Sequence, residues 1–518
     1  MRKLEKLQLF KNVSSTWLML AVNILIGVFL APFILHHLGD AAFGIWVLIF
    51  SITGYYGLFD LGIRSSVLRY FSKHLATKDE EALGKVINTS LFSYTCIGAF
   101  TFLVTVALAP YLDTFFHIAP ESHFTARLLL LMVGGAVALG FPLEITGSLL
   151  EGLQRFDIIN VTGIVFTIAR AVFIVIALTH GAGLLTVALI TVAAPLATSI
   201  VRGFIVRRLC PLPFGWRYVD RATFRQMASY SSITFMTIVA GRLKFKTDEI
   251  IIGSMMSAAA ITFFSIGSRI VDYAGLVVLG VAQVFLPMSS QTEALGNMEG
   301  LRRIFVLGNR ACAFVILPIC ATLIILGKSV IEVWVGKRYV ATSYPVLVIL
   351  ILATTLMWVQ GASTRVLFGI GKHGTLAVVT LIEGIANVIL SIVLVRPYGI
   401  IGDSLGTAIP LFCTTVVFLP WHMCHRLGVR MSTYLGEAYI LPLLLCAPMT
   451  VTMLLMKNWF VPHTYAKLAV HLAAAGVVYG AGLAWAFATK RLTEFSLPSV
   501  TKTTLEMTGT AVAVQNTF

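Results

Sequence analysis

The sequence predicts an all-α membrane protein with about fourteen transmembrane helices. We expect two pseudo-symmetric six-helix lobes around a central cavity, followed by two C-terminal helices. Three observations lead to this fold class: an apolar composition, a charge asymmetry between alternate loops, and an internal repeat. Of the 518 residues, 58% are hydrophobic and 12% are charged, whereas soluble domains carry about 25% charged residues. The mean hydropathy is +0.90.

Apolar runs long enough to cross a bilayer recur along almost the whole chain. Crossing the hydrocarbon core takes about 20 mostly apolar residues, and polar, proline and glycine breaks separate the runs. The first run is too long for a signal peptide and lacks a small-residue cleavage site, so we interpret it as a span. The predicted spans are 13–35, 42–70, 86–109, 124–149, 159–179, 185–206, 228–251, 260–287, 304–326, 344–368, 375–395, 403–424, 438–456 and 466–489.

The loops between these spans differ in charge. With the N-terminus in the cytoplasm, the cytoplasmic loops carry roughly three times as many lysines and arginines as the outer loops. Because cytoplasmic loops are enriched in positive charge, this asymmetry predicts an even number of spans with both termini in the cytoplasm. It also offers a reason for the formal charge of +15 that does not involve nucleic acid, and no nucleic-acid partner is expected.

An internal repeat predicts two homologous halves. When Tyr55 is placed on Tyr273 without gaps, the segments 52–83 and 270–301 share about eleven identities in thirty-two positions. The copies are six helices apart and therefore have the same orientation, as in parallel transporter repeats. We predict an N-terminal lobe at 1–206, a cytoplasmic linker at 207–227, a C-terminal lobe at 228–425, and two extra helices with a cytoplasmic tail at 426–518.

Charged residues inside predicted spans are the candidate functional residues. A charge near mid-membrane costs about 2.5–3.5 kcal/mol on insertion scales, so it usually faces a wet cavity or a partner. The spacing of Asp60 with Arg64, and of Arg269 with Asp272, also allows structural ion pairs on one helix face. The charges are Asp60, Arg64, Glu144, Arg170, Arg242, Lys244, Lys246, Asp248, Glu249, Arg269, Asp272, Arg310, Arg365 and Glu383.

The stretch GRLKFKTDEIIIG, residues 241–253, concentrates five of these charges. Residues two apart cannot share one helix face, so Lys244 should point away from Arg242 and Lys246. A cavity lined by Arg242 and Lys246, with Arg64, Arg269, Arg310 and Arg365 from other helices, would suit a diphosphate, because guanidinium groups match its oxygens. Lys246 could instead extend to the outer membrane surface.

Other sequence signals indicate little chemistry. The seven cysteines show no CxxC spacing, so neither a disulfide framework nor a metal site is predicted. The segment GIGKHG at 369–374 lacks the spacing of an ATP-binding loop. We expect no cofactor and no catalytic residues.

Two segments resemble the polysaccharide-transporter flippases of the multidrug/oligosaccharidyl-lipid/polysaccharide exporter superfamily. LAPFILHHLGDAAFGIWVLIFSITGYYGLFDLGIRSSVLRYFSKH, residues 30–74, resembles the opening helices of that family, and KTDEIIIGSMMSAAAITFFSIGSRI, residues 246–270, is similar to its second-half pattern. In the first segment the matching positions are Pro32, Leu38–Gly39, Phe43–Gly44, Asp60–Gly62 and Arg69–Tyr70. Arg64 departs from the pattern, because small residues are more usual after DLG.

The resemblance implies a flippase of the bacterial cytoplasmic (inner) membrane. Its cargo would be a polyprenyl-diphosphate-linked oligosaccharide repeat unit for O-antigen, capsule or exopolysaccharide, moved by alternating access. The implied partners are the lipid-linked oligosaccharide, membrane lipids, a polysaccharide polymerase with a chain-length regulator, and a coupling ion, H⁺ or Na⁺. Substrate binding is assigned to Arg64, Arg242, Lys246, Arg269, Arg310 and Arg365, and gating or ion pairing to Asp60, Asp248 and Asp272.

Two other functions remain open from the sequence. A multidrug or organic-cation antiporter of the same fold would favour an acidic cavity, whereas cations outnumber anions among the intramembrane charges. A membrane-embedded glycosyltransferase or polymerase would need paired carboxylates on a sizeable loop. The longest outer loop, near 327–343, offers only Glu332.

Overall fold

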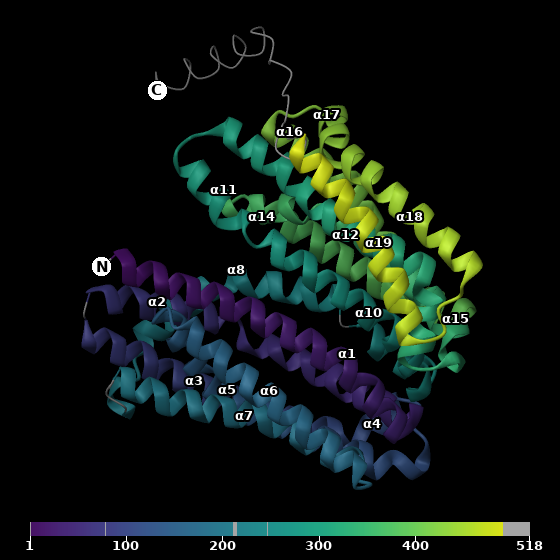
Figure 1. Ribbon diagram of the computed structural model, residues 1–518. Coiled ribbons are helices and arrows are strands. Elements are labelled where there is room, and N and C mark those ends of the chain that lie inside the picture. The colour runs from purple at the N-terminus through teal and green to yellow at the C-terminus, as the bar shows by residue number, and fades with distance from the viewer. Residues whose placement is uncertain (1, 78, 211–214, 246, 490–518) are drawn as a thin grey trace. The chain divides into compact units, whose positions relative to one another are not determined.

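The computed structural model describes residues 2–77, 79–210, 215–245 and 247–489. Within these ranges the chain is helical and contains no strand, which confirms the predicted fold class. Figure 1 shows the helices in chain order. The α-helices are α1 (Arg2–Gly54), α2 (Ile63–Thr77), α3 (Glu80–Leu108), α4 (Leu112–Phe115), α5 (His123–Gly152), α6 (Phe156–Thr179), α7 (Leu184–Leu209), α8 (Arg221–Phe245), α9 (Asp248–Met255), α10 (Ala258–Ala282), α11 (Phe285–Ala294), α12 (Met298–Trp334), α13 (Val340–Trp358), α14 (Gly361–Gly369), α15 (Gly374–Phe412), α16 (Leu419–Leu427), α17 (Met431–Leu435), α18 (Leu441–Trp459) and α19 (Tyr465–Ala488).

Shorter helical turns join or interrupt these helices. They are 3₁₀ turns, except for two stretches of π-helix, η6 and η7. They comprise η1 (Tyr55–Asp60), η2 (Ala109–Tyr111), η3 (Pro120–Ser122), η4 (Trp216–Tyr218), η5 (Lys337–Tyr339), η6 (Cys413–Phe418) and η7 (Gly436–Ile440).

Eleven helical segments of the described chain are long and apolar enough to cross a membrane. Two of them are far longer than one crossing needs, 47 residues for Ser14–Asp60 and 54 for Gly374–Leu427. Each contains one glycine with a non-helical backbone, Gly39 (φ 77) and Gly399 (φ 58). The chain is therefore a multi-pass membrane protein, and the count of fourteen spans stays a prediction.

The predicted helix 42–70 is wrong as a continuous helix. The 3₁₀ turn η1 replaces the α-helix at Tyr55, and α2 begins only at Ile63. Leu61 (φ 51) and Gly62 (φ 78) lie between them in the left-handed region, which a helix cannot contain. Similarly, the predicted span 260–287 divides into α10 and α11 at residues 283–284. Both copies of the repeated helix are thus interrupted.

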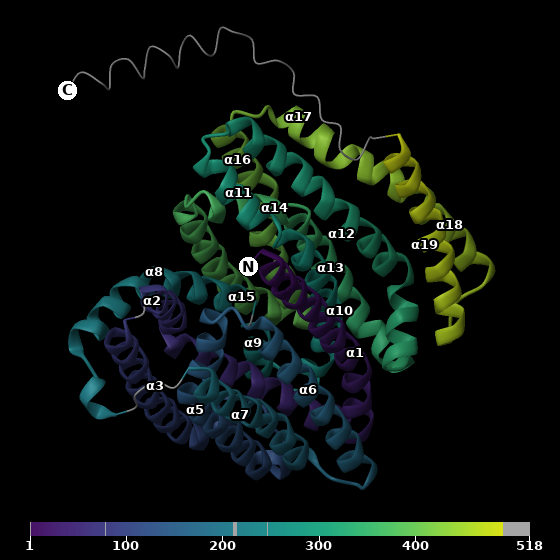
Figure 2. The same cartoon turned by 60° about the vertical axis from the view of Figure 1, so that its left-hand side comes forward.

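By their contacts, the residues form two compact units. Unit 1 comprises Met1–Leu276, Leu326–Thr354 and Gly374–Thr414, and unit 2 comprises Val277–Ile325, Thr355–His373 and Thr415–Phe518. In unit 1, α5 packs against both α3 and α7, and α6 packs against α1 and α7, as Figures 1 and 2 show. In the same unit, α8 packs along α15. In unit 2, α18 packs against α19 and α11 against α14.

The contact between α3 and α5 depends on small residues. A Cβ atom built on Gly98 of α3 would collide with the backbone carbonyl of Ala138, and one built on Gly134 of α5 would collide with Thr105. Close approach through glycine is a usual way for helices to pack in lipid, where no hydrophobic driving force brings them together. This contact forms one wall of the cavity described below.

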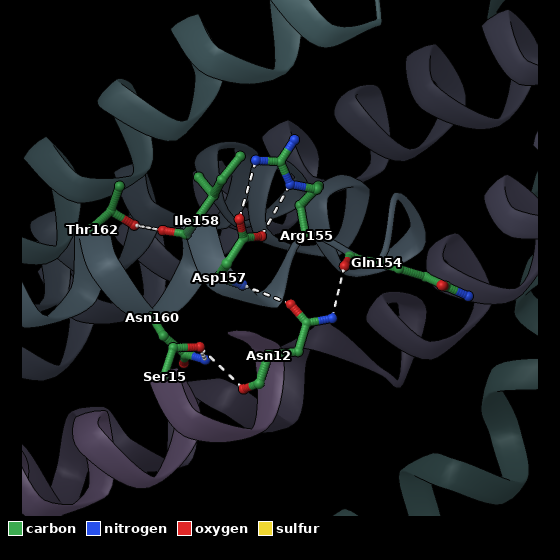
Figure 3. Close-up of polar contacts among 8 residues, drawn as sticks. All are labelled: Asn12, Ser15, Gln154, Arg155, Asp157, Ile158, Asn160 and Thr162. Carbon is green, nitrogen blue, oxygen red and sulfur yellow. Dashed lines mark hydrogen bonds and ion pairs between the residues drawn. The ribbon is translucent and has the colours of Figure 1, made fainter. Parts of the chain in front are cut away.

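Polar contacts attach the start of α1 to the turn between α5 and α6 (Figure 3). The Asn12 side chain donates to the Gln154 carbonyl at 3.1 Å and accepts from the Asp157 backbone N–H at 3.1 Å. Arg155 pairs with Asp157 at 3.0 Å, and Asn160 donates to the Ser15 hydroxyl at 3.0 Å. These bonds fix α1 beside α6, which carries a candidate site residue in its interior.

Candidate functional site

A polar cavity of about 570 Å³ lies inside unit 1. Residues of α1, η1, α2, α3, α5, α6, α7 and α8 line it, and three of these residues are arginines: Arg64, Arg170 and Arg242. We call it the arginine cavity. Asp60 and Glu144 are the acidic residues in its lining. The structure thus brings together three predicted site residues, Asp60, Arg64 and Arg242, from two segments far apart in the sequence.

The three arginines differ in how their charge is compensated. Arg64 forms an ion pair with Glu151, and its Nη1 lies 3.8 Å from Glu144 Oε2. Among the described residues, neither Arg170 nor Arg242 has a carboxylate within ion-pair distance. The Arg170 Nε is buried and has no hydrogen-bond partner within that part of the chain. The cavity therefore offers two guanidinium groups for an anion.

The glycines of YYGLFDLG make room for Arg242. A Cβ atom on Gly57 would lie 3.1 Å from Arg242 Nη2, and one on Gly54 would lie 3.7 Å from Nη1. The Tyr55 hydroxyl donates to the Arg242 carbonyl at 3.3 Å and lies 2.5 Å from the Thr247 hydroxyl. The end of α8 is thereby held against η1, with the Arg242 side chain over a glycine surface.

Asp60 and Arg64 do not form the ion pair that their spacing allows. The helix break at Leu61–Gly62 removes the i,i+4 geometry, because Asp60 ends η1 and Arg64 belongs to α2. Asp60 Oδ1 instead accepts a hydrogen bond from the Tyr94 hydroxyl at 2.7 Å. Arg64 is directed to Glu151 of α5.

A smaller cavity of about 300 Å³ adjoins the arginine cavity, since Phe50, Arg170 and Thr191 line both. Arg269, another predicted site residue, lines this side cavity, and its guanidinium lies 5.4 Å from the centre of the Phe43 ring. Arg170 therefore lies between two cavities that each contain a further arginine. Sequence reasoning noted Arg170 as an intramembrane charge but assigned it no role. Arg170 could have been assigned to the site because it is the one charged residue inside the apolar run 159–179.

Asp248 belongs to a different site of unit 1, an acidic cluster made by α9 and α15. Asp248 is buried and accepts from the Thr407 hydroxyl at 3.2 and 3.3 Å. Asn387 donates to the same hydroxyl at 2.9 Å. Asp403 is fully buried, and within the described chain neither of its carboxylate oxygens has a hydrogen-bond partner. We call Asp248, Asn387, Asp403 and Thr407 the acidic cluster.

Lys244 is separated from Arg242, as its position two residues away predicts. It is buried and pairs with Glu383 of α15 at 2.6 Å, while Arg242 lines the arginine cavity. The Lys244 carbonyl accepts from Asn387 at 3.3 Å, so the pair adjoins the acidic cluster. Sequence reasoning missed Asp403 because the predicted break at 396–402 placed it at the first position of a span. It missed Asn387 and Thr407 because only charged residues were singled out inside the spans.

The remaining predicted site residues are distributed as follows. Arg310 belongs to unit 2, where it is 3% exposed and pairs with Glu437 at 2.6 Å. Its Nε also donates to the Glu437 carbonyl at 2.6 Å, so it fastens η7 to α12. Arg365 lies on α14 of unit 2, and Asp272 is exposed on α10. Lys246 lies outside the described residues.

The described residues contain no group of three or more His, Cys, Asp or Glu side chains that could hold a metal ion. The site is instead a set of guanidinium groups inside a membrane-spanning helical bundle. This fold and this site define a membrane transporter.

A family model described as "Polysaccharide biosynthesis protein" matches residues 9–293, more than half of the chain. The chain belongs to this family of polysaccharide biosynthesis proteins. It is 21% identical over 408 residues to the putative O-antigen transporter of Shigella flexneri, a match that covers 77% of this chain and 94% of the relative.

Solved structures of transporters share the fold. The lipid II flippase MurJ in an inward closed conformation matches with a TM-score of 0.71 and 15% identity over 93% of this chain and 99% of that one. An inward-facing multidrug resistance MATE family transporter of the MOP superfamily matches with a TM-score of 0.64 and 15% identity, over 79% of this chain and 94% of its own. The family suggested by the sequence motifs is confirmed by the family model, and the chain shares its fold with transporters of the superfamily that those motifs suggest.

Proposed function

We propose that the protein is a flippase that moves a polyprenyl-diphosphate-linked oligosaccharide repeat unit to the outer leaflet of the cytoplasmic membrane for surface polysaccharide synthesis. The observation that carries this proposal is the pair of uncompensated guanidinium groups, Arg170 and Arg242, in a cavity of about 570 Å³. Membership of a polysaccharide biosynthesis family and similarity to an O-antigen transporter support the cargo class.

A diphosphate satisfies this cavity better than a cationic drug does. Guanidinium groups bind phosphate oxygens through paired, charge-assisted hydrogen bonds, which are about twice as strong as neutral ones. Arg170 and Arg242 have no carboxylate beside them. Holding their charges inside the membrane therefore costs free energy unless an anion binds. An organic-cation antiporter would need the opposite polarity, and both acidic residues of the lining face other groups: Asp60 faces Tyr94, and Glu144 lies beside Arg64.

We further propose that the acidic cluster binds the coupling ion, H⁺ or Na⁺. A fully buried carboxylate without donors is unstable as a bare anion, so Asp403 requires a proton or a cation. Asp403 interacts electrostatically with Asp248, and Asn387 and Thr407 place further oxygens beside Asp248. The oxygens of this cluster could bind Na⁺, and its carboxylates could instead bind and release a proton.

In this proposal transport occurs by alternating access between the predicted lobes, 1–206 and 228–425, with 426–518 as an accessory segment. Both termini lie in the cytoplasm. The positive charge of the predicted cytoplasmic loops supports this orientation. A polymerase with its chain-length regulator would receive the cargo at the outer leaflet.

Ligand binding by the purified protein tests the proposal. We expect polyprenyl-diphosphate disaccharide to bind, and Arg170→Ala or Arg242→Ala to weaken binding about 10- to 100-fold, because each removes a charge-assisted hydrogen bond of about 1.5–3 kcal/mol. Native mass spectrometry against ligand concentration gives the dissociation constants. Gly57→Ala should act in the same direction as Arg242→Ala, since its methyl group would displace that guanidinium.

Arg396→Ala is the matched control, because Arg396 is an exposed arginine of α15 in the same unit. It should leave binding unchanged. The proposal fails if the cavity arginines can be removed without effect on the diphosphate ligand, or if tetraphenylphosphonium binds and competes with it.

A further inference from the structure

Glu144 of α5 presents an exposed carboxylate to the arginine cavity. Its side chain is 57% exposed, although it belongs to a helix long and apolar enough to cross the membrane. Asp60, the other acidic residue of the lining, is less exposed and accepts a hydrogen bond from Tyr94. Glu144 Oε2 lies 3.8 Å from Arg64 Nη1, which is longer than a hydrogen bond. The Glu144 carboxylate is therefore available to a ligand in the cavity.

Glu144 belongs to a cluster of two carboxylates and two arginines. Arg64 makes its shorter contact with Glu151, not with Glu144. Arg202 of α7 acts on Glu144 electrostatically. Its guanidinium donates to the Ile159 carbonyl at 2.7 Å, however, and it is not part of the cavity lining. Each arginine of the cluster thus has a closer partner within the protein, and Glu144 faces the cavity.

Arg170 lies toward the other end of the cavity. It lines the side cavity as well, together with Thr191 of α7. Near Glu144, by contrast, the Thr146 hydroxyl donates to the Ser199 carbonyl of α7 at 3.3 Å. At 1.5 Å per residue, Thr191 and Ser199 are about 12 Å apart along the axis of α7. The cavity therefore has a cationic end and an end at which a carboxylate is exposed.

Arg242 approaches the cavity at the cationic end. Its guanidinium lies beside Gly54 and Gly57. Phe50, about one helical turn before Gly54, lines the side cavity together with Arg170. A diphosphate held by these two arginines would fill the cationic end, and the sugars attached to it would occupy the rest of the cavity.

We propose that Glu144 determines which sugars the protein accepts: it binds hydroxyl or ammonium groups on the second sugar of the cargo and disfavours a carboxylate there. This inference rests on the proposed function. The second sugar is the one concerned, because the separation of the two ends exceeds the length of one pyranose ring. An ionised carboxylate accepts strong, charge-assisted hydrogen bonds, whereas like charges in close contact repel each other. The cargo class is a repeat unit with a neutral or amino sugar at this position.

Three polyprenyl-diphosphate disaccharides that differ only in the second sugar test this assignment. That sugar is a neutral hexose, a hexosamine with a free amino group, or a hexuronic acid. Native mass spectrometry of the purified protein gives a dissociation constant for each ligand. We expect the hexuronic acid ligand to bind at least about tenfold more weakly than the hexose ligand, because its charge repels that of Glu144. The hexosamine ligand should bind most tightly.

Glu144→Gln should bring the three dissociation constants within about threefold of one another, chiefly through tighter binding of the hexuronic acid ligand, because the repulsive charge is gone. Glu144→Asp keeps the charge and should keep the order of the ligands. A structural defect would weaken all three ligands alike, so their ratio reports the charge of Glu144. Glu121→Gln is the matched control, because Glu121 is an exposed carboxylate of η3 in the same unit and outside the cavity lining. It should leave all three constants unchanged.

Equal binding of the hexose and hexuronic acid ligands by the unaltered protein would overturn the inference. So would an unchanged ratio of the two in Glu144→Gln. In those cases diphosphate binding that still depends on Arg242 leaves the proposed function in place. If none of the three ligands binds, the proposed function fails, and this inference fails with it.

Discussion

Single side chains decide the polarity of the arginine cavity. Arg64 is compensated by Glu151, while Arg170 and Arg242 are not, so two positive charges remain for a ligand. Gly57 leaves room for the Arg242 charge, because a Cβ atom there would lie 3.1 Å from Arg242 Nη2. The glycines of the repeated helix therefore serve the site as well as the packing.

Asp403 gives a prediction at the residue scale. Replacing it with Asn removes the buried carboxylate that needs a proton or a cation, and the amide keeps its size. In Asp403→Asn we expect the stimulation of transport by Na⁺ or H⁺ to be at least about tenfold weaker, whereas diphosphate binding should be kept. The initial rate of cargo movement is measured against Na⁺ at fixed pH, and against pH without Na⁺.

Asp79→Asn is the control for this change, because Asp79 is exposed and caps α3 through the Ala82 backbone N–H, a bond that Asn can also accept. Its ion dependence should match that of the unaltered protein. An Asp403→Asn protein with the same ion dependence would show that the acidic cluster is not the coupling site.

Sequence reasoning found part of the site at this scale. Asp60, Arg64 and Arg242 were singled out as intramembrane charges, and the structure places all three around one cavity. The partners of Asp60 and Arg64 could not be predicted, because i,i+4 spacing implies contact only in an unbroken helix. Tyr94 and Glu151 reach them from α3 and α5, and such long-range contacts leave no local pattern.

At the scale of the element, breaks inside predicted helices position the site. The left-handed pair Leu61–Gly62 turns the chain at the end of η1. Asp60 and Arg64 then line the arginine cavity, whereas Leu61 and Ile63 line a separate apolar cavity of about 720 Å³. Hydrophobicity alone did not reveal this break, because apolar residues such as Ile63 and Val67 continue beyond it. Gly62 was the indication of a break in the sequence, because glycine adopts the left-handed conformation without strain.

The contact between α3 and α5 gives a prediction for this scale. Gly98→Ala would set a methyl group against the Ala138 carbonyl, so one helix must move. Overpacking of this kind costs about 1–3 kcal/mol. We expect a lower thermal midpoint in fluorescence-detected size-exclusion chromatography. The same substitution at Gly135 meets only the Phe102 ring at ordinary contact distance, 3.7 Å, and should be tolerated. Equal midpoints for the two variants would refute this packing role.

At the scale of the whole molecule, composition and periodicity predicted the fold class correctly. An all-helical, multi-pass membrane protein follows from about 20-residue apolar runs, and the structure has eleven candidate spans among its described residues. Exact boundaries could not follow from the sequence, since the backbone of a single glycine such as Gly39 can break a long helical run. The family motifs supplied the transporter class, which composition alone does not distinguish from other membrane proteins.

The central claim is that this chain moves a lipid-linked oligosaccharide between leaflets. The most direct measurement reconstitutes the protein with a fluorescent polyprenyl-diphosphate oligosaccharide and follows its leaflet by quenching from outside. We predict movement faster than in protein-free liposomes, loss of that movement in Arg170→Ala and Arg242→Ala, and no efflux of cationic dyes. Cargo that stays in its leaflet as in protein-free liposomes, together with efflux of cationic dyes, would contradict the proposal.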